Sequence, residues 1–394
     1  MIDFNNTEIA FSMKSNADLR NAYLLFSTIQ NRTIVKTAKS ATMLAIKLQL
    51  PLSWAVKPTL YRQFVGGETL EDCLKNVNIL NSYNVKSVLD YSAEGGTELE
   101  DVQKAYDETI RSIDFAAGNQ SVAYTVFKPS AMIINRVLVK ASENFPSLGD
   151  IEKAEYENLR ERIFALCEKA HKSNVRILID AEHFASQELI DRIVEESMRR
   201  YNKERAIVFQ TLQMYRKDRL QYLKFLHEDS VKNKYVPGIK FVRGAYMEEE
   251  RARAYELSYI DPIHPDKEST DNSYNEGLRY VVENIDNFEL FSGTHNYESN
   301  QLLAQLIDEK GLKRDDRRIF FSQLYGMSDN ISFTLAREGF NVCKYVPYAP
   351  VNKVLPYLLR RAEENTSMSG QTSRELQLIK AELERRRQGI NGSS

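Results

Sequence analysis

Glycine is scarce in this sequence. It supplies 16 of the 394 residues, roughly 4% against a usual ~7%. Neither G-x-G-x-x-G nor G-x-x-x-x-G-K-[ST] occurs, so the two commonest phosphate-binding glycine loops are absent. These absences exclude the Rossmann and P-loop routes to a nucleotide, and any cofactor has to be held in another way.

Cysteine and long apolar runs are also sparse. The three cysteines, Cys73, Cys167 and Cys343, lie far apart without a C-x-x-C pair, which excludes a zinc knuckle or a disulfide framework. No run approaches the ~18 apolar residues of a membrane span, and the N-terminus lacks a basic segment followed by an apolar core. With a net charge of -2, we expect a cytoplasmic protein without a signal or transit peptide and without affinity for nucleic acid.

One stretch has no acidic residue at all, from Leu19 to Gly67. It carries Arg20, Arg32, Lys36, Lys39, Lys47, Lys57 and Arg62, interleaved with apolar residues at helical spacing. Such basic amphipathic helices are typical of segments that lie on anionic lipid. Residues 19–67 therefore predict either a peripheral contact with an anionic membrane or a basic arm packed on the rest of the protein.

Short β-branched or aromatic runs recur along the chain, each followed by a longer amphipathic stretch. We find eight such runs: Val85–Tyr91, Ser121–Phe127, Val175–Ala181, Ala206–Leu212, Gly238–Arg243, Phe288–Ser292, Arg318–Gln323 and Asn341–Val346. Repeated strand–helix alternation is typical of a (β/α)8 barrel. We predict an α/β fold with a distorted TIM-like barrel over residues 84–370, a helical arm over residues 1–83, and a C-terminal helix and tail over residues 371–394.

Polar residues follow almost every predicted strand, at the end where such barrels place their chemistry. They include Lys128, Asp180, Gln210 with Gln213, Arg243, Thr294 to Asn296, Gln323 to Gly326, and Tyr345. Because the carboxyl ends of the strands meet at one face of a barrel, we predict that these side chains converge on one polar cavity.

After the last predicted strand, a helical pattern carries the adjacent arginines Arg360 and Arg361. Arg361 falls three residues after Leu358 and seven after Val354, on the inward apolar stripe. A buried guanidinium needs a partner. The pattern allows Glu364 on the same helix, or a substrate carboxylate that the two arginines grip together.

Eight segments of the sequence are similar, in order, to motifs of one enzyme family. They are FVGGETLEDC, LDYSAEG, FKPSAM, LIDAEH, KFVRGAYMEEER, GTHN, FSQLYGMSD and KYVPYAPVNKVLPYLLRRAEENTS, from about residue 64 to 368. They resemble proline dehydrogenases, in the form found in stand-alone enzymes rather than in bifunctional bacterial ones. The resemblance implies an FAD-containing barrel that oxidises L-proline to 1-pyrroline-5-carboxylate and passes electrons to a membrane quinone.

The resemblance also implies roles for individual residues. Lys128, Arg360 and Arg361 would hold the proline carboxylate, Asp180 and Glu364 would keep these cations ordered, and Tyr345 and Leu324 would pack around the ring with Tyr325 close by. The flavin would be contacted by Gln210, Lys240, Val242, Arg243, Gly244, Ala245 and Tyr246, and by Thr294, His295 and Asn296 at the pyrophosphate and adenosine end. Met247 departs from the tryptophan of bifunctional relatives, and Lys240 replaces a frequent arginine.

Other interpretations stay open beside this one. The same scaffold can oxidise hydroxyproline, although relatives of that type tend to lack an aromatic residue at the position of Tyr345. A second alternative is an aldolase-type barrel in which Lys128 forms a Schiff base. A third is a barrel that binds an anion without catalysis. Asp180, Glu182 and His183 offer three metal-ligand side chains, but neighbouring residues alternate faces, so we predict no metal site.

Overall fold

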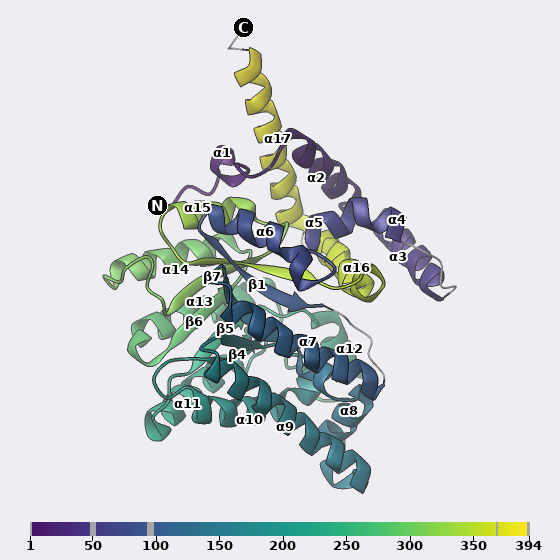
Figure 1. The fold of residues 1–394 in the computed structure, drawn as a ribbon, viewed down its shortest axis with the longest axis vertical. Helices are drawn as coiled ribbons and strands as arrows, with labels where there is room; N and C mark the ends of the chain where they lie inside the picture. Colours follow the sequence, from purple (N-terminus) through teal and green to yellow (C-terminus); the bar gives the residue numbers. More distant parts are fainter. Residues whose placement is uncertain (1, 48–52, 93–97, 368, 392–394) are drawn as a thin grey trace.

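Eight parallel strands close into a barrel in the computed structural model of this chain, paired in sequence order from β1 to β8 and back to β1 (Figure 1). The strands are β1 (Val85–Tyr91), β2 (Val122–Phe127), β3 (Arg176–Ile179), β4 (Val208–Gln213), β5 (Gly238–Val242), β6 (Glu289–Gly293), β7 (Ile319–Leu324) and β8 (Val342–Tyr348). The structure describes residues 2–47, 53–92, 98–367 and 369–391. The predicted barrel is confirmed, and every strand end lies within two residues of its predicted position.

Helices follow the strands and cover the outside of the barrel (Figure 1). They are α7 (Leu99–Ala117), η2 (Pro129–Met132), α8 (Asn135–Asn144), η3 (Phe145–Ser147), α9 (Asp150–Lys172), α10 (Phe184–Tyr201), α11 (Arg219–Asn233), α12 (Met247–Glu256), α13 (Lys267–Glu283), η4 (Ile285–Asn287), α14 (Tyr297–Glu309), α15 (Asp329–Arg337) and α16 (Val351–Ser367). Apolar side chains between strands and helices form the larger part of the core.

The interior of the barrel is filled from its amino-terminal end. Tyr124 of β2 contacts Phe209, Phe291 and Phe320 edge-on, with ring centroids 5.3, 4.9 and 5.3 Å away. Below these rings Arg176 donates to Glu289 at 2.7 Å. The amino-terminal end is therefore a packed plug, and polar chemistry is left to the carboxyl end of the strands.

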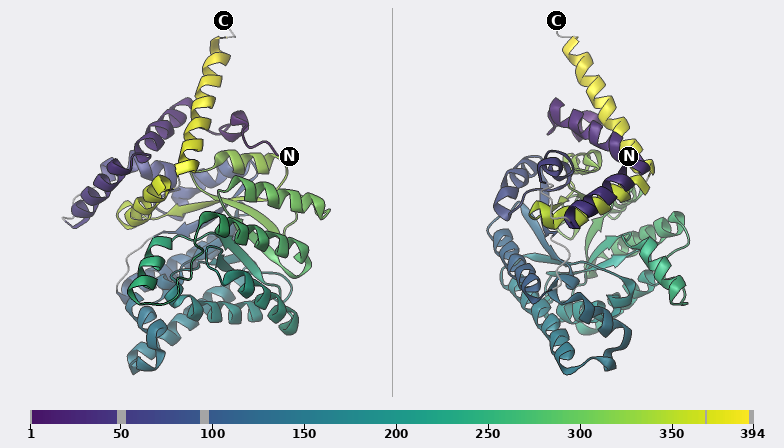
Figure 2. Two further views of the ribbon diagram at one scale, coloured as in Figure 1. Left: turned by 180° about the vertical axis from the view of Figure 1, so that it is seen from behind. Right: turned by 90° about the vertical axis from the view of Figure 1, so that its right-hand side faces the viewer.

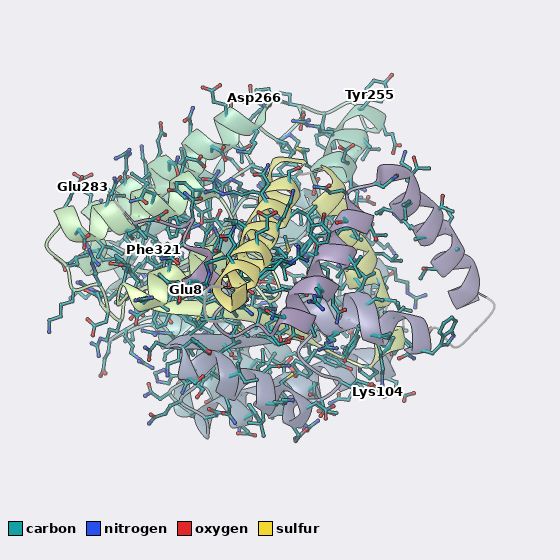
Figure 3. The ribbon with its side chains drawn as sticks, turned by 90° about the horizontal axis from the view of Figure 1, so that it is seen from above. Glu8, Lys104, Tyr255, Asp266, Glu283 and Phe321 are labelled. Carbon is teal, nitrogen blue, oxygen red and sulfur yellow. The ribbon has the colours of Figure 1, made fainter. Side chains whose placement is uncertain are left out.

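The segment before the barrel consists of α1 (Thr7–Ala10), α2 (Asn16–Ile29), α3 (Arg32–Lys47), α4 (Ser53–Val56), η1 (Lys57–Tyr61), α5 (Arg62–Phe64) and α6 (Leu70–Ser82). Helix α2 starts at a capping box of Ser15 and Asp18 and buries Leu19, Ala22, Phe26 and Ile29. It packs along α17 (Ser369–Asn391), and α3 packs against α16. Figures 2 and 3 show α17 extending away from the barrel toward the C-terminus, with α2 beside it.

Candidate active site

Four side chains from four different strands meet at the carboxyl end of the barrel. Asp180, just after β3, accepts from Lys240 of β5 at 2.5 Å and from the hydroxyl of Tyr345 of β8 at 3.0 Å. Lys128, just after β2, donates to the same carboxylate at 3.4 Å. The Lys240 ammonium also lies 4.8 Å from the centre of the Tyr345 ring. One carboxylate thus holds two cations and a phenol in a fixed arrangement.

The pKa values of the two buried carboxylates near Lys128 are shifted in opposite directions. Burial would raise the pKa of Asp180, but Lys240 and Lys128 together hold it below its usual value. Asp90 of β1 lies 3.9 Å from Lys128 and accepts from Ser92. Burial raises the pKa of Asp90, with Lys128 opposing the rise and Asp180 adding to it. Sequence reasoning missed Asp90, although its place near the end of the first strand was a signal.

Helix α16 brings the two arginines to the same face of the barrel. The Arg361 guanidinium lies 5.2 Å from the centre of the Tyr357 ring. Burial, followed by the charges of Lys344, Arg361 and Arg243, lowers the pKa of His295 to about 3, so this imidazole is neutral. Burial and Glu182 raise the pKa of Tyr246, while Lys128 and Arg360 lower it. The side chain of Glu364, the predicted arginine partner, lies outside the described residues.

The combination of a closed barrel, a lysine–aspartate–tyrosine cluster and an Arg-Arg helix agrees with one family. A family model described as proline dehydrogenase matches residues 73–374. The chain belongs to the proline dehydrogenase family. It is similar to the carbapenem antibiotics biosynthesis protein CarD of Pectobacterium carotovorum, at 35% identity over 82% of this chain and 83% of the relative.

Proline dehydrogenases of plants and animals are also similar to this chain. Arabidopsis thaliana mitochondrial proline dehydrogenase 2 is 33% identical over 84% of this chain and 78% of its own length. The human mitochondrial enzyme is 40% identical over 60% of this chain and 40% of its own. Among solved structures, proline utilization A from Bdellovibrio bacteriovorus inactivated by N-propargylglycine superposes with a TM-score of 0.71 at 18% identity, over 91% of this chain and 38% of that one. This likeness shows the fold.

The turn after β5 carries several of the residues predicted to contact a flavin, among them Gly244, Ala245 and Tyr246. Gly244 and Ala245 are exposed, Val242 is half-buried, and the Tyr246 ring lies against His183 with centroids 4.3 Å apart. Gly244 has φ +134°, and a Cβ there would meet the Tyr215 ring at 2.5 Å. Glycine is thus required at this turn by the backbone and by Tyr215.

Arg243 anchors the neighbouring strand end. Its guanidinium donates to Asp271 at 2.7 Å, to Thr294 at 2.5 Å and to Ser299 at 3.0 Å. Asn296 caps α14 through the Ser299 amide at 2.8 Å. Thr294 and Asn296 are therefore bonded to protein groups, and His295, hydrogen-bonded to Ser328 at 2.9 Å, lies between them.

Gln210 requires a correction. Its side chain donates to Asp191 of α10 at 2.8 Å and to Tyr222 of α11 at 2.7 Å, so it faces the helix layer and not the barrel interior. Side chains alternate along a strand, and Phe209 of β4 lies in the interior cluster. Gln213 therefore shares the inward face with Phe209, and its Oε1 is buried with no hydrogen-bond partner among the described residues.

Tyr325 is a second correction. Leu324 packs with the interior cluster beside Tyr345, as a ring-packing residue would. Tyr325 instead packs with the outer core. Burial raises the pKa of Tyr325. The charge of Lys14 opposes this rise, and the charge of Asp329 adds to it. Tyr325 thus faces the N-terminal segment and not the Lys128–Asp180 cluster.

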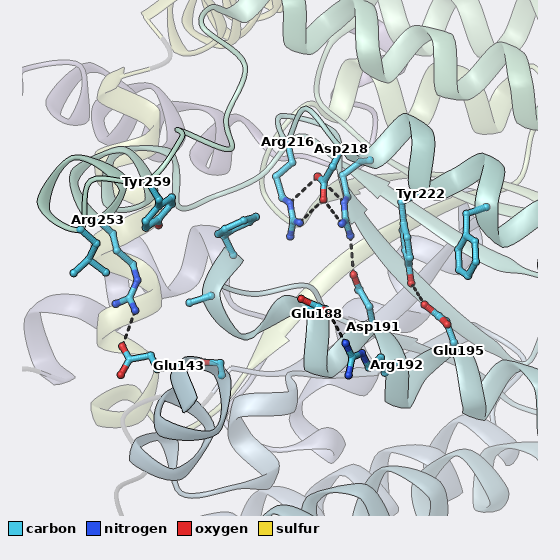
Figure 4. Close-up of a pocket in the computed structure, with 16 residues that line it drawn as sticks. Glu143, Glu188, Asp191, Arg192, Glu195, Arg216, Asp218, Tyr222, Arg253 and Tyr259 are labelled. Carbon is cyan, nitrogen blue, oxygen red and sulfur yellow. Dashed lines mark hydrogen bonds and ion pairs between the residues drawn. The ribbon is translucent and has the colours of Figure 1, made fainter. Parts of the chain in front are cut away.

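A cavity of about 660 Å³ lies in the helix layer, between α8, α10, α11 and α12 (Figure 4). Its polar wall is a chain of ion pairs in which Arg216 and Arg219 share Asp218, and Arg219 also donates to Asp191 at 2.8 Å. Asp191 is the residue that binds Gln210. The cavity therefore lies behind Gln210, apart from the cluster at Asp180.

Proposed function

We propose that this protein oxidises L-proline to 1-pyrroline-5-carboxylate with FAD as its cofactor and a quinone as electron acceptor. The supporting observation is the cluster in which Asp180 orders Lys128, Lys240 and Tyr345 on the face that α16 reaches with Arg360 and Arg361. Three cations around one small anion bind a carboxylate strongly and in one orientation. An amino acid with an apolar ring fits such a clamp beside Tyr345 and Leu324.

The residues present fit FAD. Gln213 presents a buried carbonyl oxygen with no hydrogen-bond partner in the described part of the chain, which suits an N–H of the flavin ring. Lys240 would supply a cation beside the flavin ring, and Arg243 with the neutral His295 would suit the phosphate end. When bound, FAD supplies the hydride acceptor, and a nearby cation stabilises its reduced, anionic form.

The protein's own part in the reaction is positioning. The carboxylate clamp of Lys128, Arg360 and Arg361 would hold the ring carbon next to the proline nitrogen at near-attack distance from the flavin. Tyr345 cannot rotate freely, because its hydroxyl is bonded to Asp180 at 3.0 Å. No side chain is assigned as the base, and we infer that the amine loses its proton to solvent before the hydride leaves.

Anaerobic addition of L-proline to the purified protein should bleach its flavin absorption. Bleaching is expected because the clamp orients the substrate for hydride transfer and no oxidant is present to re-oxidise the reduced flavin. The check is a visible spectrum before and after proline, with acetate as a carboxylate that cannot be oxidised. A folded but colourless protein that takes up no added FAD would overturn the proposal, and a non-catalytic anion site would then be favoured.

The same assay separates proline from hydroxyproline. Tyr345 and Leu324 pack in one apolar cluster, and we propose that they enclose the substrate ring, where an added hydroxyl would need room. We therefore expect a higher kcat/KM for proline, and the reverse order would favour the hydroxyproline alternative.

Exposed apolar and basic residues within the described ranges 19–47 and 53–67 support a proposed contact with a membrane, where quinones reside. Leu24, Ile34 and Trp54 are 64%, 46% and 77% exposed, and Arg20 and Lys36 are exposed near them in sequence. The inner face of α2 is packed on α17, so packing and lipid contact use opposite faces. No helix in the described part of the chain is long and apolar enough to cross a bilayer. We propose a cytoplasmic, peripheral location.

Trp54 gives a direct test of this contact, because it is the only tryptophan of the chain. Anionic vesicles should shift its emission to the blue at about 0.05 M salt and less so at about 1 M, where charges are screened beyond ~3 Å. Leu24→Glu should weaken vesicle co-sedimentation, whereas Ile151→Glu, at an 87% exposed position on α9, should not. If vesicle binding were insensitive both to salt and to Leu24→Glu, the membrane contact proposed for this segment would be overturned, and the segment would serve only as an arm packed on the protein.

A further inference from the structure

The loop between β7 and α15 has an unusual backbone at Ser328. Ser328 is 3% exposed and adopts φ +51°, in the left-handed region that side chains disfavour. It stands at the N-cap of α15, yet its hydroxyl makes no capping bond there. That hydroxyl is instead hydrogen-bonded to Nδ1 of His295 at 2.9 Å. A residue in a strained conformation whose hydroxyl bonds to a histidine instead of capping the helix indicates a functional constraint.

The backbone amide of Ser328 is one of the donors that a helix start leaves without an intrahelical partner. Glu375 of α17 supplies the acceptor, since the amide donates to its Oε2 at 3.2 Å. Glu375 is 8% exposed. The three residues therefore form one chain, from α17 through Ser328 to His295, which crosses from the C-terminal helix to the mouth of the barrel.

Charged groups from other elements hold this chain in place. Asp329 accepts from Lys344 of β8 at 2.8 Å, and Lys14 lies 3.6 Å from it. Lys344 also donates to the Met327 carbonyl at 2.5 Å. Burial and Asp329 raise the pKa of Glu375 to about 7, with Lys344 opposing the rise. Either protonation state of Glu375 keeps an oxygen that accepts from the Ser328 amide.

We propose that Glu375 is a positioning residue for the flavin: it fixes Ser328, and Ser328 fixes His295 at the pyrophosphate end of the FAD site. The proposal rests on FAD being held at His295. It makes α17 part of the cofactor site, although none of the side chains described for α17 contacts the Lys128–Asp180 cluster. Without the Glu375 acceptor, the loop is expected to leave its left-handed conformation and to withdraw the Ser328 hydroxyl from His295.

The test is the dissociation constant of FAD, measured on the full-length protein by equilibrium dialysis. Glu375→Ala should raise it about tenfold, by analogy with the effect of outer hydrogen-bond partners on metal-binding histidines. Glu375→Gln keeps an acceptor and should stay within about twofold of the parent. Ser328→Ala leaves Glu375 in place, removes only the hydroxyl, and should match Glu375→Ala, which keeps the test decisive if Glu375→Ala fails to fold.

Glu382→Ala is the matched control. Glu382 is buried on the same helix but binds Arg385 at 2.8 Å and Arg386 at 2.6 Å, so its loss weakens α17 away from Ser328. An unchanged FAD affinity in Glu375→Ala and Ser328→Ala would overturn the proposal, as would an equal loss in Glu382→Ala. Failure of the parent protein to bind FAD would instead overturn the proposed function.

Discussion

Replacing Arg361 with methionine should lower kcat/KM for L-proline by roughly a thousandfold, equivalent to ~4 kcal/mol of transition-state stabilisation. Methionine keeps most of the length and apolar contact of the arginine stem, so its packing on Tyr357 is largely retained. It removes the charge that would meet the substrate carboxylate. Truncating one partner of a buried charge pair commonly costs ~2–5 kcal/mol, which is the size of this effect.

The measurement is steady-state kinetics with proline, together with flavin content and the thermal unfolding midpoint. Arg200→Met is the control, because the Arg200 guanidinium of α10 also lies over an aromatic ring, 4.1 Å from the centre of Phe164. Arg200 is at the end of α10 that is remote from the carboxyl ends of the strands. Arg200→Met should leave kcat/KM unchanged. A loss of stability in Arg361→Met with normal kcat/KM would show that Arg361 serves only as a structural partner of Glu364.

The barrel was predictable because its signal is local and repeated. Each strand is a short β-branched or aromatic run, and each following helix has its own apolar stripe. Lys128, Asp180 and Tyr345 could be brought together from sequence for a topological reason. Lys128 and Asp180 directly follow β2 and β3, and Tyr345 lies in the β8 run of the same parallel barrel, so their side chains meet at one face.

The choice between Gln210 and Gln213 could not be made in this way. All six residues of β4 are buried, with strand neighbours on one face and helices on the other, so no polar–apolar alternation marks the inward side. Two positions three residues apart lie on opposite faces, and only the observed pairing decides which faces the interior. The prediction for Tyr325 was wrong for a related reason. Tyr325 lies one residue beyond the end of β7, where strand alternation no longer fixes the direction of a side chain.

Glu375 shows a different limit. It is separated from Ser328 by 47 positions, and its contact depends on how α17 packs on α2 and α16. Docking of one helix on another is set by the sum of many apolar contacts, and no short motif encodes it. A cofactor-positioning residue that depends on long-range helix packing therefore cannot be predicted from the positions of strand ends.

Replacing Asp180 with asparagine should reduce both stability and activity. The amide keeps the shape but removes the charge that holds Lys240 at 2.5 Å and Lys128 at 3.4 Å. Loss of one partner from a buried ion pair costs ~3–5 kcal/mol. We also expect kcat/KM for proline to fall by roughly a hundredfold or more, because Lys128 and Tyr345 are no longer oriented.

The pH dependence of the stability loss has a definite sign. The pKa of Asp180 is held below its usual value of 3.8 by Lys240 and Lys128, against the effect of burial. The stability that the carboxylate contributes is therefore complete above the unfolded pKa and is lost as the pH falls through the lower folded pKa. Denaturant unfolding should show a constant gap between parent and Asp180→Asn near neutral pH, which narrows below about pH 4.

Glu289→Gln separates the two consequences of the Asp180 change. Glu289 forms a comparable buried pair with Arg176 at 2.7 Å, but at the amino-terminal end of the barrel. It should lose stability to a similar extent while kcat/KM for proline stays within about twofold, because that end of the barrel serves stability and not chemistry. If both variants lost activity in proportion to stability, Asp180 would have no role at the substrate site beyond holding the barrel together.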